Sequence, residues 1–101
     1  MISGLTLEAE SAAQFLKLIA NTNRLLILCT LEDGAANVGQ LEQKLGVSQP
    51  ALSQHLARMR QEGVLATKRQ GQHIFYSIKD QKIKKLLPVL TDLFDRSQQS
   101  A

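Results

Sequence analysis

The stretch over residues 48–62 limits the possible folds most, because it is predicted to form one helix with two different faces. Ser48 stands where a helix N-cap belongs, and Pro50 falls in the first turn, where its missing backbone N–H costs little. An apolar stripe with the i, i+4, i+7 spacing of a helix is formed by Leu52, Leu56 and Met59. The other faces carry short hydrogen-bonding groups and long cations, and no acid precedes Glu62.

The polar faces of this helix carry groups that suit the major groove of DNA. Amides and hydroxyls can bond to base edges, and cations can bond to phosphates. The residues of this helix expected to contact DNA are Ser48, Gln49, Ser53, Gln54, His55 and Arg58. An ordinary amphipathic surface helix would show a similar pattern, so the residues on either side must decide between the two interpretations.

A helix-turn-helix is predicted from the residues that precede this helix. Asn37 can cap a short helix over Val38–Leu45, with its apolar residues facing inward. Gly46 follows at the position where a left-handed glycine commonly ends a helix. Two helices joined by a short turn that contains glycine, the second with a polar face, form the pattern of a DNA-reading motif.

A β-hairpin is predicted after the reading helix, from strand-like stretches at Val64–Arg69 and His73–Ile78. Gly71 lies between them and can supply the positive φ of a hairpin turn. A two-stranded ribbon in this place is a wing, whose tip can reach backbone phosphate or a minor groove. The wing residues expected to contact DNA are Lys68, Arg69, Gln70 and Gln72.

Helices on both sides of the reading motif are predicted to join two subunits. The first covers Glu8–Ala20, and the last begins at Asp80, with Pro88 leaving open whether it kinks or divides in two. Between them Thr22–Leu31, with Asn21 as its cap, is apolar on almost all sides, which predicts a central, buried helix. A chain of 101 residues buries a limited core, so a dimer that adds apolar area would help it.

The charge distribution favours a nucleic acid as partner. The net charge of +3 is mild, but it is unevenly placed. Residues 1–47 hold three cations against five acids, residues 48–72 hold four against one, and residues 73–101 hold five against three. The positive field therefore begins at the reading helix, as a polyanion partner requires.

Several classes of protein are disfavoured by what the sequence lacks. The single cysteine allows no intramolecular disulfide, and no signal peptide or membrane-spanning apolar run is visible. No catalytic constellation or phosphate-binding loop is evident, so neither an enzyme nor a cofactor is expected. We expect a cytoplasmic protein without membrane contact. It is mainly α-helical with a small β-hairpin, forming one winged helix-turn-helix domain over residues 1–101, with flexible ends at about 1–6 and 97–101.

Four motifs resemble those of the ArsR/SmtB family of winged-helix repressors, and the resemblance covers about Glu8 to Phe94. They are Asn21-Thr-Asn-Arg24-Leu-Leu-Ile-Leu, Val47-Ser-Gln-Pro-Ala-Leu-Ser-Gln-His-Leu56, Glu62-Gly-Val-Leu and Arg69-Gln-Gly-Gln-His-Ile-Phe-Tyr-Ser-Ile. The resemblance implies a homodimer that binds an operator palindrome in double-stranded DNA. It also implies that the DNA is released when an inducer binds or a thiol is modified.

The metal sites known in that family are absent from this sequence. Metal-sensing members carry Cys-x-Cys at the third helix or an Asp/His set on the last helix. Here the third helix begins Val38-Gly39-Gln40, and the last helix contains neither His nor Cys. A soft-metal site needs thiolates or imidazoles that converge, so no metal is expected to bind at these positions.

Cys29 resembles the second-helix cysteine of the family's sensors of persulfide and reactive sulfur. Those sensors pair it with a second cysteine near the end of the last helix, where this chain has Leu93-Phe94-Asp95. One interpretation is a redox or reactive-sulfur response through Cys29 alone. The other, which the apolar surroundings favour, is a buried small hydrophobic residue.

Two classes of function follow from these observations. The first is a dimeric DNA-binding transcriptional repressor, which the basic bias of residues 48–72 and the polar face of the reading helix favour. The alternative is a winged-helix module that binds protein, and a repressor with an unidentified small-molecule inducer is also open.

Overall fold

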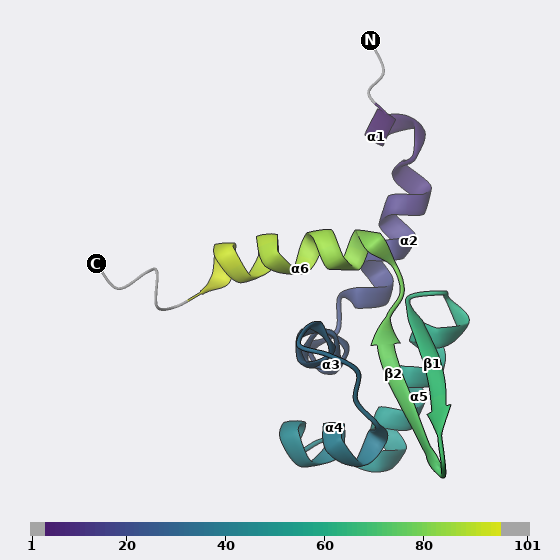
Figure 1. Cartoon of the computed structure of the whole chain (residues 1–101). Coiled ribbons are helices and arrows are strands. Elements are labelled where there is room, and N and C mark those ends of the chain that lie inside the picture. Colours follow the sequence, from purple (N-terminus) through teal and green to yellow (C-terminus); the bar gives the residue numbers. More distant parts are fainter. Residues whose placement is uncertain (1–3, 96–101) are drawn as a thin grey trace.

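The computed structural model describes residues 4–95 as a mainly helical protein with one two-stranded antiparallel hairpin (Figure 1). The elements, in chain order, are α1 (Gly4–Leu7), α2 (Ala9–Ile19), α3 (Thr22–Glu32), α4 (Val38–Leu45), α5 (Gln49–Gln61), β1 (Leu65–Gln70), β2 (His73–Ile78) and α6 (Gln81–Phe94). α4 and α5 form the helix-turn-helix, and β1 and β2 form the wing. The predicted winged-helix fold is therefore confirmed.

Capping residues explain where the helices begin. The Asn21 side chain accepts a hydrogen bond from the backbone N–H of Arg24, which starts α3. Asn37 and Gln40 exchange side-chain and backbone hydrogen bonds in a capping box at the start of α4. Gly46 ends α4 in the left-handed conformation, with φ of 66°. The caps predicted from the sequence at these positions are confirmed.

The wing differs by one residue from the predicted strand and turn. The carbonyl of Val64 accepts the N–H groups of Lys79 and Asp80 instead of pairing within the ribbon, so β1 begins at Leu65. Gln70 pairs with His73 and belongs to the strand, which leaves a two-residue turn at Gly71 and Gln72. The φ of Gly71 is 62°, and a glycine at the first position is what a type II′ hairpin turn requires.

A third backbone segment braces the wing, and the sequence does not predict it. Ala36, in the loop before α4, forms an isolated antiparallel bridge with Tyr76 of β2. The Tyr76 N–H donates to the Ala36 carbonyl at 2.8 Å, and the reverse bond measures 3.1 Å. The base of the wing is thereby tied to the loop that enters the helix-turn-helix.

One core lies between α3, α4, α5 and the start of α6. Its fully buried side chains are Ile27, Leu28, Leu41, Leu52, Leu56, Met59, Val64, Ile83 and Leu87. The predicted stripe of α5 is therefore confirmed as the face that anchors the reading helix. Figure 1 shows α2 and α6 at one end of the molecule, and α4 with the tip of the wing at the other.

The prediction that α3 is buried on all sides is wrong for one face. Ile27, Leu28 and Leu31 lie in the core, but Leu26 is 41% exposed and Cys29 is also exposed. The favoured interpretation of Cys29 as a buried hydrophobic residue is wrong for the same reason. The described part of this small chain, residues 4–95, covers only one side of α3.

The two ends of the chain also differ from expectation where they are described. Residues 4–6, expected to be flexible, belong with Leu7 to the short helix α1, while the tail expected at 97–101 lies outside the described residues. Pro88 lies within α6, which is one helix and is not divided in two. Pro88 and Lys84, four residues earlier, are both exposed, so water can replace the hydrogen bond that the proline removes. Within residues 4–95 no helix is long and apolar enough to span a membrane.

Candidate nucleic-acid interface

The exposed face of α5 collects the polar residues that the sequence assigned to DNA contact. Gln49, Ser53, Gln54 and Arg58 are all exposed, opposite the buried stripe. Residues four apart are neighbours on a helix surface, so Gln49 lies beside Ser53, and Gln54 beside Arg58. The result is two rows at the solvent surface of α5, one with an amide and a hydroxyl and the other with an amide and a guanidinium. His55 differs from them because it is half-buried.

Three of the residues predicted to contact DNA also form hydrogen bonds or ion pairs within the chain. The Ser48 hydroxyl caps α5 by accepting the N–H of Ala51 at 3.4 Å. The backbone N–H of Gln49 donates to the carboxylate of Glu42 at 3.1 Å, which leaves its side-chain amide available. Arg58 lies 3.7 Å from Glu62, but the two side chains are 59% and 51% exposed, so the pair is weak and Arg58 can exchange it for a phosphate.

The wing tip exposes all four of its predicted contact residues, Lys68, Arg69, Gln70 and Gln72. The Nε of Arg69 donates to the Gly71 carbonyl at 3.1 Å, which holds the guanidinium against the turn. Successive residues of a strand point to opposite faces, so Lys68 and Arg69 leave the ribbon on different sides. The structure therefore does not bring these two cations together on one face of the ribbon.

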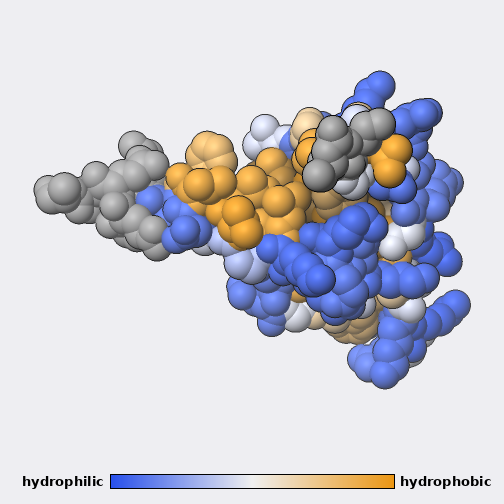
Figure 2. Space-filling model, turned by 90° about the horizontal axis from the view of Figure 1, so that it is seen from above, coloured by the Kyte–Doolittle hydropathy of each residue, from blue (hydrophilic) through white to orange (hydrophobic). Residues whose placement is uncertain are grey.

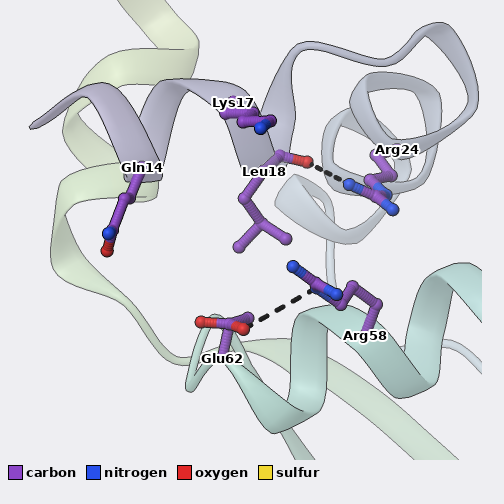
Figure 3. A pocket seen from close by; sticks show the side chains of 6 residues that line it. All are labelled: Gln14, Lys17, Leu18, Arg24, Arg58 and Glu62. Atoms are coloured by element: carbon purple, nitrogen blue, oxygen red, sulfur yellow. Dashed lines mark hydrogen bonds and ion pairs between the residues drawn. The ribbon is translucent and has the colours of Figure 1, made fainter. Parts of the chain in front are cut away.

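Arg24 is a residue of this region that the site prediction omitted. Its side chain donates from a terminal nitrogen to the Leu18 carbonyl at the end of α2, at 2.7 Å (Figure 3). Its Nε donates to Nδ1 of His55 on α5 at 3.2 Å. Partial burial, and secondly the charge of Arg24, lower the pKa of His55 below the ordinary 6.5. The only sequence signal for these contacts of Arg24 was its position in the first turn of a helix, where a cation does not suit the helix dipole.

A hollow of about 550 Å³ opens beside Arg24, between the end of α2 and the end of α5 (Figure 3). It is lined by Gln14, Lys17, Leu18, Arg24, Arg58 and Glu62. Lys17 and Arg58 belong to the last turns of α2 and α5, where cations complement the negative ends of helix dipoles. The charges of Lys17 and Arg58 are thus explained by the two helix ends and need no bound anion.

A second hollow, of about 610 Å³, exposes the side of α3 that carries Cys29. It is lined by Leu25, Cys29, Leu87, Leu90, Thr91, Phe94 and Asp95. Burial, and secondly the carboxylate of Glu32, raise the pKa of the Cys29 thiol. The thiol is accessible but is less ionised at neutral pH than an ordinary cysteine. Figure 2 shows hydrophobic residues gathered along α6.

Among residues 4–95, no three His, Cys, Asp or Glu side chains come close enough together to hold a metal ion. Both histidines belong instead to the reading helix and the wing.

Comparison with known proteins identifies the same architecture in characterised regulators. The chain is 44% identical over 87 residues to the nodulation protein NolR of Rhizobium meliloti, an alignment that covers 86% of this chain and 71% of NolR. It is 40% identical to the transcriptional activator HlyU of Vibrio cholerae, covering 90% of this chain and 84% of HlyU. The crystal structure of the transcriptional repressor BigR from Xylella fastidiosa superposes with a TM-score of 0.82 at 38% identity, covering 86% of this chain and 89% of BigR.

The family signature described as bacterial regulatory protein, arsR family, matches residues 21–67. That range contains α3, the helix-turn-helix and the start of the wing. Together with relatives that share the fold over most of their length, it shows that the chain belongs to the arsR family of bacterial transcription regulators.

Proposed function

We propose that this protein is a cytoplasmic transcriptional repressor that binds an operator palindrome in double-stranded DNA as a homodimer. The observation that carries the proposal is the division of α5 between a fully buried stripe and an exposed polar face. Leu52, Leu56 and Met59 fix the helix, so Gln49, Ser53 and Gln54 are held toward solvent without needing to order on binding. A rigid helix with this face fits a major groove.

The proposed roles divide between reading bases and holding the backbone. Ser53 and Gln54 are proposed to contact base edges, because hydroxyls and amides can distinguish bases there. Arg58 and Arg69 are proposed to hold phosphates, since both are exposed and weakly engaged within the chain. Lys68, Gln70 and Gln72 extend the contact at the wing. Neither a catalytic step nor a bound cofactor forms part of this proposal.

The homodimer is proposed to form through α2 and α6. Leu16 on α2 and Val89, Leu93 and Phe94 on α6 are more than half exposed, which is a large apolar surface for a chain of this size. Two reading helices held about one helical turn of DNA apart would meet the half-sites of a palindrome. The relatives named as a repressor and as an activator support DNA-dependent regulation, and repression is the mode we propose.

A mobility-shift titration with the DNA upstream of the protein's own gene tests this function. We expect a complex that survives an excess of random DNA and that weakens steeply with salt. The Gln54→Ala variant should lose roughly 1–3 kcal/mol of discrimination between operator and random DNA, because a base contact is lost. Gln14→Ala, an exposed glutamine on α2, is the matched control and should bind as the wild type does.

Two results of that titration would contradict the proposal. Equal effects of Gln54→Ala on operator and random DNA would remove the base-reading role. Failure of the wild type to bind DNA would favour the alternative, a winged-helix module that binds protein.

The signal that releases DNA is proposed to act at the hollow beside Cys29. The exposed thiol favours a redox or reactive-sulfur response, which without a second cysteine must be an event at one thiol of each subunit. The apolar lining of the same hollow would also accept a small-molecule inducer.

A further inference from the structure

The side chain of Arg24 joins three helices, because it belongs to α3 and forms hydrogen bonds with α2 and α5. Its backbone N–H is held by the Asn21 cap at 3.1 Å, so the start of the side chain is fixed. Its guanidinium then donates to the Leu18 carbonyl of α2 at 2.7 Å and to His55 Nδ1 of α5 at 3.2 Å. Both hydrogen bonds are partly buried, which reduces competition from water.

The bond to Arg24 determines which nitrogen of His55 carries the proton. A guanidinium has five N–H donors and no acceptor, so Nδ1 must be the acceptor in this contact. A neutral imidazole carries one N–H, which must therefore lie on Nε2. A protonated imidazole would place an N–H against the guanidinium, which both the geometry and the neighbouring charge oppose.

The Nε2 edge of His55 is open to solvent. Within residues 4–95, many residues are at least partly buried. Every side-chain nitrogen or oxygen in them that is shielded from solvent has a hydrogen-bond partner. His55 is such a residue, and the bond to Arg24 at Nδ1 is its one hydrogen bond in this part of the chain. Nε2, which has no partner among these residues, is therefore not buried and can reach water.

We propose that Arg24 is a positioning residue for DNA recognition, because it fixes His55 as the Nε2–H tautomer and makes its outer edge a hydrogen-bond donor to DNA. The DNA contact rests on the proposed function. The acceptor is a phosphate oxygen or a purine N7 or O6, all of which accept and cannot donate. The other neutral tautomer would present a lone pair at Nε2 and would gain no bond from any of these atoms.

The tautomer is tested first in the free protein, by two-bond ¹⁵N–¹H correlation spectra at a pH where both histidines are neutral. His73 is an internal reference, because it is exposed on the wing and can exchange between tautomers. We expect His55 to show a single Nε2–H form, with Nδ1 unprotonated, and His73 to show a mixture. In Arg24→Met the His55 signals should move toward the mixture seen for His73. An Nδ1–H form, or a His55 pattern that is the same with and without Arg24, would overturn the proposal.

The DNA contact is tested with two variants of His55, each of which keeps a polar group near the position of one ring nitrogen. His55→Asn retains a polar group near Nδ1 and can still meet Arg24, but it loses the outer donor. His55→Gln retains an amide near Nε2 and loses the Arg24 contact. We expect His55→Asn to lower operator affinity by roughly ten- to a hundredfold, as the loss of a hydrogen bond to a charged group implies, and His55→Gln to lower it less. The reverse order, or no loss in His55→Asn, would overturn the proposal.

Thermal unfolding of each variant separates this role from simple loss of structure. The affinity comparison is made between variants whose unfolding midpoints agree. If Arg24→Met fails to fold, Arg24→Gln replaces it, because an amide can donate or accept and therefore no longer dictates which nitrogen of His55 carries the proton. If the wild type binds no DNA, the proposed function fails and so does the DNA contact of His55. The spectra would still show whether Arg24 fixes the tautomer, so the two failures are distinguishable.

Discussion

Shortening two apolar side chains on α6 should weaken the proposed dimer without unfolding the subunit. Val89 and Leu93 lie one helical turn apart and are 53% and 62% exposed. Complete burial of such a side chain stabilises by about 1.5–3 kcal/mol, so covering the exposed half contributes about 1 kcal/mol each. A two-fold interface contains every residue twice. The Val89→Ala/Leu93→Ala variant should therefore lose about 4 kcal/mol of association free energy, which raises the dimer Kd by roughly a thousandfold.

Sedimentation equilibrium over a range of protein concentrations measures this change directly. Ile74→Ala is the matched control, because Ile74 is 45% exposed but lies on the wing, away from α6. We expect the control to associate as the wild type does, and both variants to keep their helical circular dichroism. A double variant that associates as tightly as the wild type would show that α6 does not contribute to the interface, and the reasoning from exposed apolar area would fail.

Three further predictions concern the wing, His55 and Cys29. Arg69→Ala should weaken binding to operator and random DNA alike and reduce the salt slope by about one, as measured by titration at several salt concentrations. Because burial and then Arg24 lower the pKa of His55 below 6.5, the unfolded chain binds its proton first as the pH falls. The stability that neutral His55 contributes should thus be complete above pH 6.5 and should decline below that pH. Denaturant unfolding at several pH values would detect this loss in the wild type and not in His55→Gln. Polysulfide should lower the operator affinity of the wild type and leave that of Cys29→Ser unchanged; equal responses would exclude Cys29 as the sensor.

Features governed by neighbouring residues could be predicted from the sequence. A cap such as Asn37 bonds within its own first turn, and the left-handed glycine at Gly46 acts on the carbonyls just before it. The stripe of α5 follows from the helical period alone. These local rules sufficed for the helix-turn-helix and the wing, with an error of one residue at each end of β1.

Features that join distant parts of the chain could not be predicted in this way. The bond between Arg24 and His55 spans 31 residues, and the bridge between Ala36 and Tyr76 also joins separate elements. Neither pair leaves a periodic signal, since each depends on how helices and hairpin pack. The polar character of His55 was visible in the sequence, but Arg24, the partner that determines which ring nitrogen carries the proton, was not.

The wrong prediction that α3 is buried on all sides has a different origin. The rule that an all-apolar helix must be covered is sound, but we applied it to a single chain. A helix that is apolar on all sides must be covered on all sides, but the rule does not say by which chain. The described residues of the chain cover Ile27, Leu28 and Leu31 and leave Leu26 and Cys29 exposed. The open face continues into the apolar surface of α6 through Leu90 and Phe94, which line the same hollow. The surplus of apolar residues in α3 and the exposed stripe of α6 are thus one feature, and both follow from a domain whose core is too small to use all its hydrophobic residues.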